Sequence, residues 1–170
     1  MIADAFLASD VCHRLQALNT EITQTLPLGG NELLAAEYVP KQGALSEWDD
    51  ETRLVLYRWD GGRGFERVQF VSKAGKSIKG KLAGLELFDF DHDGVPEIVA
   101  IGGPYGPSAR VASKVYRRTA AGGKFENVWL RKDFGAAFDL RGPAYVTLDH
   151  ESFKPRRTGL AIQDGKLGER

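Results

Sequence analysis

The sequence predicts a mainly β protein built from antiparallel strands, with one α-helix at its N-terminus. After Gly30, short segments rich in β-branched and aromatic residues alternate with turn-forming clusters, which is typical of antiparallel sheets. Before Gly30, apolar residues recur every three or four positions, which indicates an amphipathic helix. Two hairpin-like stretches resemble each other, and such repetition favours stacked or radially arranged β-sheets.

The expected helix carries its apolar side chains on one face. They are Leu7, Val11, Leu15, Leu18 and Ile22. Their spacing predicts a helix of about five turns, which should end before the proline and glycines of "LPLGG". We therefore expect residues 1–28 to form a helix that packs on a β-rich domain of blade-like repeats, residues 29–170.

The strands are expected in a series of short stretches. In chain order these are "LLAAEYV", "TRLVLYRW", "FERVQFV", "GLELFD", "EIVAIGG", "RVASKVYRR", "FENVWLR", "AAFDL", "AYVTLD" and "TGLAIQ". Two of the resulting hairpins share a Tyr-Arg pair before a glycine turn and a Phe-Glu-x-Val stretch after it. The alignment matches Tyr57 with Tyr116, Phe65 with Phe125 and Val68 with Val128. Either the chain contains a true internal repeat, or two hairpins have converged on one pattern.

Composition restricts the possible functions. The chain has 170 residues, of which 42% are hydrophobic, so it can bury one core. Its 23 basic and 23 acidic residues balance, which gives no reason to expect binding to nucleic acid or to an anionic membrane. Cys12 is the only cysteine, which excludes an intrachain disulfide and a cysteine zinc site. No apolar run approaches the roughly 18 to 20 residues needed to span a bilayer.

The stretch "LFDFDHDGVPEIVA", residues 87–100, joins two of the expected strands and has the ligand spacing of a calcium loop. Counted from Asp89, oxygen ligands fall at positions 1, 3, 5, 7 and 9. They are the side chains of Asp89, Asp91, Asp93 and Glu97 and the carbonyl of Val95. Calcium prefers about six to eight oxygen ligands, and Gly94 would permit the sharp turn around the ion. An EF-hand would need glutamate where Ala100 stands, so we expect a strand-to-strand loop.

The same residues resemble a known family. "DFDHDGVPEIV" is similar to the D-x-D-x-D-G-x-x-[DE]-hydrophobic signature of FG-GAP or VCBS-type repeats, the blades of the integrin α-subunit β-propeller and of many bacterial extracytoplasmic proteins. In that family the aspartate loop links the first two strands of a blade, and two further strands follow as a hairpin. The resemblance implies one blade over residues 82–130. It implies Asp89, Asp91, Asp93, Val95 and Glu97 as its Ca²⁺ ligands.

The sequence departs from the family in two respects. The neighbouring unit, "GAAFDLRGPAYVTLD", has only Asp139 where the aspartate loop should be, so it should not bind calcium. The chain also has room for only two or three blades, whereas propellers typically have about four to eight. We therefore expect a partial propeller-like assembly or a single curved β array.

We expect the calcium ion to be a structural staple of the long hairpin, with catalytic calcium as the alternative. Extracellular calcium modules bind with Kd values of about 10⁻⁴ to 10⁻³ M, so such a site would fill in the periplasm or outside the cell. The start "MIADAFLASD" lacks the pattern of a secretory signal, so the chain either stays inside the cell or is a processed form. His92, between two ligands, is expected to be solvated.

A loop expected over residues 101–114 offers a second candidate site. It contains three glycines and two prolines, and it follows the calcium hairpin directly. Tyr105, Ser108 and Arg110 could therefore be presented to a partner with little ordering cost. The alternative is a plain connection between two strands.

These observations predict a non-enzymatic, calcium-stabilised module that binds another protein. The resemblance implies two roles: a periplasmic inhibitor or immunity protein acting on a cell-wall-degrading enzyme, or a cell-surface adhesion component. A carboxylate-dependent hydrolase is the third hypothesis, but no second acidic cluster stands at a suitable place for it. We expect no catalytic residues.

Overall fold

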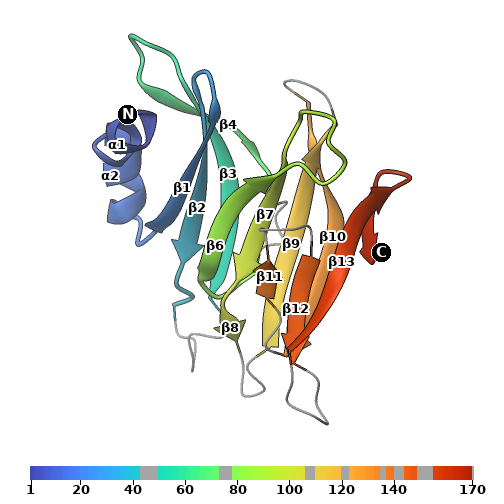
Figure 1. Cartoon of the computed structure of the whole chain (residues 1–170). Helices are drawn as coiled ribbons and strands as arrows, with labels where there is room; N and C mark the ends of the chain where they lie inside the picture. The colour runs from blue at the N-terminus through green and yellow to red at the C-terminus, as the bar shows by residue number, and fades with distance from the viewer. Residues whose placement is uncertain are drawn as a thin grey trace. The chain divides into compact units, whose positions relative to one another are not determined.

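The computed structural model describes residues 1–42, 50–72, 78–105, 110–119, 123–134, 137–139, 144–148 and 155–169. These residues are mainly antiparallel strands, with short helices at the N-terminus, which confirms the predicted class (Figure 1). No closed barrel or propeller is formed by the part of the chain that is described. The chain divides into two compact units, Met1–Leu82 and Ala83–Arg170.

The first unit consists of two short helices and one antiparallel sheet. The helices are α1 (Ile2–Leu7) and α2 (Asp10–Ala17). The sheet has the order β1-β2-β3-β4, and a short fifth strand, β5, pairs with β3. Its strands are β1 (Glu21–Gly29), β2 (Glu32–Val39), β3 (Glu51–Trp59), β4 (Phe65–Phe70) and β5 (Ile78–Lys79).

The prediction of one five-turn helix is wrong in its extent. Ser9 interrupts it, because the Ser9 hydroxyl accepts a hydrogen bond from the Cys12 N–H and caps a new helix, α2. Asn19, with φ of 57°, lies between α2 and β1. Ile22 belongs to β1, where β-branched residues favour a strand, and Pro27 is tolerated because β1 is an edge strand.

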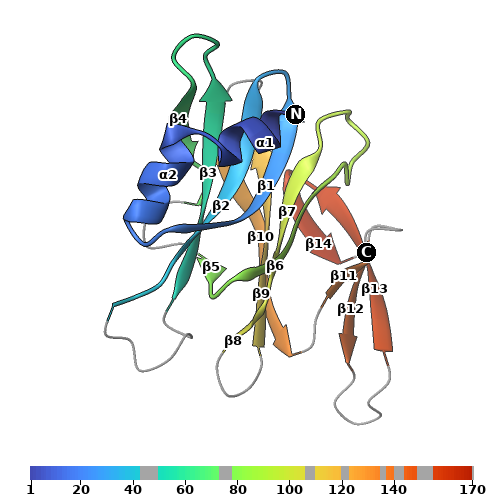
Figure 2. The same ribbon diagram turned by 90° about the vertical axis from the view of Figure 1, so that its left-hand side faces the viewer.

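The helices pack on one face of the first sheet (Figure 2). Phe6 of α1 is fully buried. Its ring centroid lies 4.7 Å from that of Tyr57 and 5.1 Å from that of Phe65. Leu33 and Val55 complete the centre of this cluster, so α1 is held by aromatic packing on β3 and β4.

The second unit contains two antiparallel sheets. In the first of them the order is β10-β9-β7-β6, with β8 paired to β9. Its strands are β6 (Leu82–Phe88), β7 (Glu97–Gly102), β8 (Pro104–Tyr105), β9 (Arg110–Arg118) and β10 (Phe125–Phe134). These include the strands expected for the blade over residues 82–130. The other sheet has the order β11-β12-β13-β14. Its strands are β11 (Ala137–Asp139), β12 (Ala144–Leu148), β13 (Pro155–Gln163) and β14 (Lys166–Glu169).

A second apolar core joins these two sheets within the second unit. Its buried residues are Phe90, Val99, Val115, Leu160 and Leu167. Phe90 comes from the aspartate loop, Val99 and Val115 come from β7 and β9, and the two leucines come from β13 and β14. The loop that carries the candidate ligands is therefore anchored in a core by its own phenylalanine.

The two hairpins that looked alike in sequence share one register. The pairs nearest the turns are Trp59 with Phe65 and Arg118 with Phe125. Tyr57 and Tyr116 each lie in the third pair from the turn. Beyond the tyrosine each ladder shifts by one residue, at Val68 in the first hairpin and at Val128 in the second. A shared bulge at aligned positions supports a true repeat over convergence of two unrelated hairpins.

Candidate metal centre

The candidate site lies on the connection between β6 and β7. Residues 89–96 form this connection, and Glu97 is the first residue of β7. The Phe90 side chain is buried, whereas Asp91 and the residues up to 96 are partly or fully exposed. His92 and Gly94 have φ values of 60° and 84°, which curl the backbone between the aspartates. His92 is exposed, as expected for a solvated side chain.

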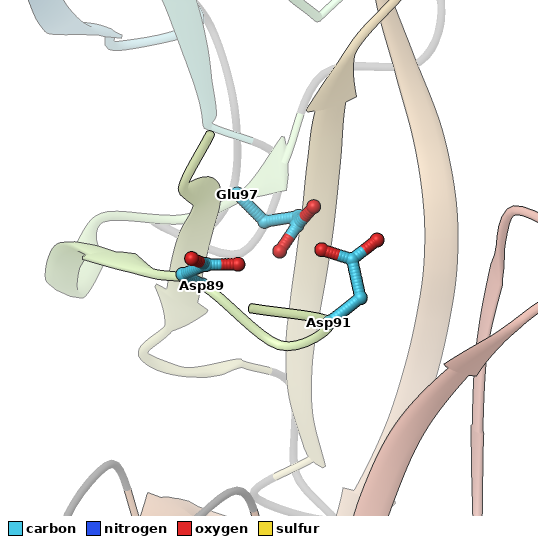
Figure 3. Close-up of side chains that lie close together, drawn as sticks. All are labelled: Asp89, Asp91 and Glu97. Atoms are coloured by element: carbon cyan, nitrogen blue, oxygen red, sulfur yellow. The ribbon is translucent and has the colours of Figure 1, made fainter. Parts of the chain in front are cut away.

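The structure brings three of the five predicted ligands together. Carboxylate oxygens of Asp89, Asp91 and Glu97 all lie within 4.8 Å of one another, and the side chains point toward a common centre (Figure 3). Calcium binds oxygen at about 2.3–2.6 Å, so two oxygens on one ion are at most about 5 Å apart. The spacing of the three carboxylates is therefore compatible with a single calcium ion.

Glu97 is the buried member of the cluster. Its side chain is fully buried, and its Oε2 accepts a hydrogen bond from the Phe90 N–H at 3.0 Å. Its Oε1 is buried without a hydrogen-bond partner among the described residues. Burial raises the pKa of Glu97, and the nearby Asp91 carboxylate raises it further. A cation at this point would satisfy the Oε1 atom and favour the ionised carboxylate.

Backbone N–H groups of the loop hydrogen-bond to the carboxylates of Asp93 and Asp89. Asp93 is not one of the three convergent carboxylates; its Oδ1 accepts a hydrogen bond from the Val95 N–H at 2.8 Å. That bond, with help from Arg117, holds the pKa of Asp93 below its usual value. The Asp89 carboxylate accepts from the N–H groups of Asp93 and Gly94, at 3.2 and 2.9 Å. The backbone of the loop thus holds the aspartates in place.

Arg117, on β9, is the residue of the site that sequence reasoning missed. Its Nη2 donates hydrogen bonds to Asp91 Oδ2 at 2.7 Å and to Asp93 Oδ2 at 2.8 Å. Its Nε lies 3.6 Å from Glu97 Oε1, which is an ion pair but too long for a hydrogen bond. In the repeat Arg117 aligns with Arg58, which pairs with Glu32 in the first sheet, but that pairing is visible only in the structure.

The proposed partner loop is shorter than expected. The prediction of a loop over residues 101–114 is wrong in its extent, because β7 continues to Gly102 and β9 begins at Arg110. Tyr105 and Arg110 are directly opposed across β8 and β9. Ser108 lies outside the described residues. The two ends of the short connection are therefore joined by strand pairing.

No family model, curated protein or solved structure matches the chain. Among the described helices, none is long and apolar enough to cross a membrane. The fold and the site define a β protein of repeated antiparallel sheets that carries a candidate cation site on one hairpin.

Proposed function

We propose that the protein is a calcium-stabilised, non-enzymatic module that binds another protein. The observation that carries this proposal is the convergence of Asp89, Asp91 and Glu97 beside a buried oxygen, Glu97 Oε1, that has no hydrogen-bond partner in the described part of the chain. Oxygen ligands at this spacing suit a hard divalent cation.

The position of the cluster favours a structural ion over a catalytic one. Asp89 and Asp91 follow β6, and Glu97 begins β7, so an ion shared by them ties the loop to the sheet. Backbone N–H groups of Asp93 and Gly94 hold the Asp89 carboxylate in the loop, which suits a ligand fixed for a structural ion. The hydrolase hypothesis needs a second acidic cluster besides the one that would hold the ion, and Asp89, Asp91 and Glu97 form the one cluster found among the described residues.

The family and the cellular location are part of the same proposal. The aspartate signature lies on the connection between β6 and β7, the first two strands of a five-stranded antiparallel sheet, and in FG-GAP or VCBS-type blades it also links the first two strands. Membership of that family would suit a partner outside the cytoplasm, where calcium is abundant. A cell-wall-degrading enzyme, inhibited in the periplasm, is the proposed partner, and an adhesion role at the cell surface is the alternative.

We place the partner surface on the connection between β8 and β9. Tyr105, Ser108 and Arg110 belong to it, and strand pairing of Tyr105 with Arg110 fixes both of its ends. Tyrosine and arginine are among the residue types enriched where binding energy concentrates at protein interfaces.

The calcium staple is tested by thermal unfolding of the wild type and of Asp91→Asn. At 10 mM calcium, a Kd of about 10⁻⁴ to 10⁻³ M would stabilise the wild type by about 1.4–2.7 kcal/mol relative to chelator. This corresponds to a rise in Tm of about 3 to 10 °C for a chain of this size. Asp91→Asn should abolish the rise. Glu32→Gln, on β2 of the first unit and not a member of the cluster, should retain it; an equal Tm in calcium and chelator for the wild type would reject the structural calcium ion.

The partner surface is tested by capture of partners from a periplasmic extract in calcium and in chelator. The double variant Tyr105→Ala, Arg110→Ala should lose the partner while its Tm stays unchanged. Arg63→Ala, an exposed arginine on the turn between β3 and β4, serves as the control. Retention of the partner by the double variant would remove these two residues from the interface.

A further inference from the structure

Arg117 occupies the position where a cation would neutralise the acidic cluster. Its guanidinium lies 2.7 Å from Asp91 and 2.8 Å from Asp93, and 3.6 Å from the buried Glu97 Oε1. Two of these three carboxylates, Asp91 and Glu97, are also members of the candidate calcium cluster. The arginine and a metal ion would therefore share ligands.

The pairing of Arg117 with Glu97 has a counterpart in the first sheet. There Arg58 Nη2 lies 3.1 Å from Glu32 Oε1, across β2 and β3. Arg58 and Arg117 each follow the aligned tyrosine, and Glu32 and Glu97 each begin the second strand of their sheet. The arginine–glutamate pair is thus common to both sheets, whereas the aspartates are present in only one of these hairpins.

We propose that Arg117 is a built-in counter-cation that competes with calcium for the acidic cluster. This inference rests on the proposed calcium site. Calcium bound to Asp91 and Glu97 at about 2.3–2.6 Å would stand within a few ångströms of the guanidinium, and charges of the same sign at that distance repel strongly. Metal binding therefore requires Arg117 to withdraw from Asp91 and Glu97.

The competition explains how the metal-free protein tolerates its carboxylates. Without calcium, the Arg117 charge and the backbone N–H groups offset the repulsion between the four acidic side chains of the loop and β7. With calcium, part of the binding free energy is spent on displacing Arg117, which lowers the apparent affinity. Arg117 is partly exposed, with 27% of its side chain accessible, so the displaced guanidinium can move toward solvent.

The test is calorimetric titration of calcium chloride into the wild type, Arg117→Gln and Arg58→Gln. Arg117→Gln should bind calcium at least about fivefold more tightly than the wild type, because the competing charge is gone. Its Tm in chelator should be lower than that of the wild type. Arg58→Gln removes the equivalent charge from the sheet without the aspartates, and should leave calcium affinity unchanged.

The possible outcomes separate this inference from the proposed function. If the wild type binds calcium and Arg117→Gln binds it equally or more weakly, competition is rejected and the calcium site stands. If neither binds calcium, the calcium site fails and the competition fails with it. If Arg117→Gln binds calcium tightly and the wild type shows no binding, competition is supported, and Arg117 blocks the site completely in the wild type.

A second measurement on the wild type keeps the test open if Arg117→Gln does not fold. The Nε–H resonance of Arg117 in a nitrogen-15 spectrum, assigned with Arg117→Lys, should shift as calcium is added. A position that stays unchanged at saturating calcium would overturn the displacement.

Discussion

The sheet of β1 to β4 and the sheet of β6, β7, β9 and β10 share their strand order and hairpin register but differ in the connection between their first two strands. In the first sheet only Gly30 and Asn31 separate β1 from β2. In the second sheet, residues 89–96 separate β6 from β7 and carry the aspartates. The same framework can therefore carry either a tight turn or a candidate metal loop.

The two sheets also differ in which face carries their local apolar cluster. In the first sheet, Leu33 and Tyr57 pack against the helices. Leu33 pairs with Tyr57 and Ile98 pairs with the aligned Tyr116, so Leu33 corresponds to Ile98. Val99, in the core of the second unit, therefore corresponds to Leu34, whose side chain lies on the face opposite to that of Leu33. The helices of the first unit cover one face of β2 and β3. The sheet of β11 to β14 covers the opposite face of the equivalent strands, β7 and β9, in the second unit.

Loss of the Phe6 ring, which packs α1 on the first sheet, should destabilise the protein more than any other substitution considered. Phe6→Ala removes a fully buried ring from contact with Tyr57 and Phe65, and should lower the free energy of unfolding by about 3–5 kcal/mol. Urea denaturation of the variant measures this loss. Leu18→Ala is the control, because Leu18 is 74% exposed and its truncation should cost little.

A loss of less than about 1 kcal/mol in Phe6→Ala would contradict this assignment. It would mean that the sheet of β1 to β4 is stable without the helices.

The aligned tyrosines, Tyr57 and Tyr116, differ in the hydrogen bonding of their hydroxyl groups. The Tyr57 hydroxyl donates a hydrogen bond to the buried Glu37 carboxylate, which also pairs with Arg53 at 3.2 Å. The Tyr116 hydroxyl is buried and has no hydrogen-bond partner among the described residues. Burial raises the pKa of both tyrosines, and Glu37 adds to the rise at Tyr57.

The variants Tyr57→Phe and Tyr116→Phe should therefore behave differently. Tyr57→Phe leaves a buried carboxylate short of a donor and should cost about 1–3 kcal/mol in unfolding free energy. Tyr116→Phe removes a hydroxyl that makes no such bond, and should be neutral or slightly stabilising. Equal losses in urea denaturation would show that both hydroxyls are satisfied in solution.

Local signals in the sequence were sufficient for the strands and for the acidic loop. Alternating β-branched and aromatic residues marked the main strands, and the carboxylate spacing within one connection brought Asp89, Asp91 and Glu97 together. The helix was extended too far because its apolar period continues through Ile22. The period carries no information about the cap at Ser9, which begins the second helix.

The parts that could not be predicted depend on contacts between distant residues. Arg117 reaches the loop only because β9 pairs with β7, which places Tyr116 opposite Ile98. A motif search within the loop cannot find such a residue. β1 was missed because Pro27 suggests a break, whereas an edge strand has no neighbour on one side that needs the missing N–H.

The pH dependence of thermal stability should distinguish Glu97 from Glu32, with a smaller effect than the substitutions above. The pKa of Glu97 is raised in the folded chain, so without calcium its contribution to stability is complete below the ordinary glutamate pKa of about 4.3. That contribution is lost as pH rises through the folded pKa. In chelator, the Tm of the wild type relative to Glu97→Gln should therefore fall as pH increases from 4 to 7.

In calcium the trend reverses, because the ion binds the ionised carboxylate, and the calcium-induced rise in Tm should grow over the same range. Glu32→Gln, measured in parallel, should follow the wild type in the size of the calcium-induced rise at each pH. A calcium effect in the wild type that is independent of pH would separate Glu97 from the ion and leave the aspartates alone as its ligands.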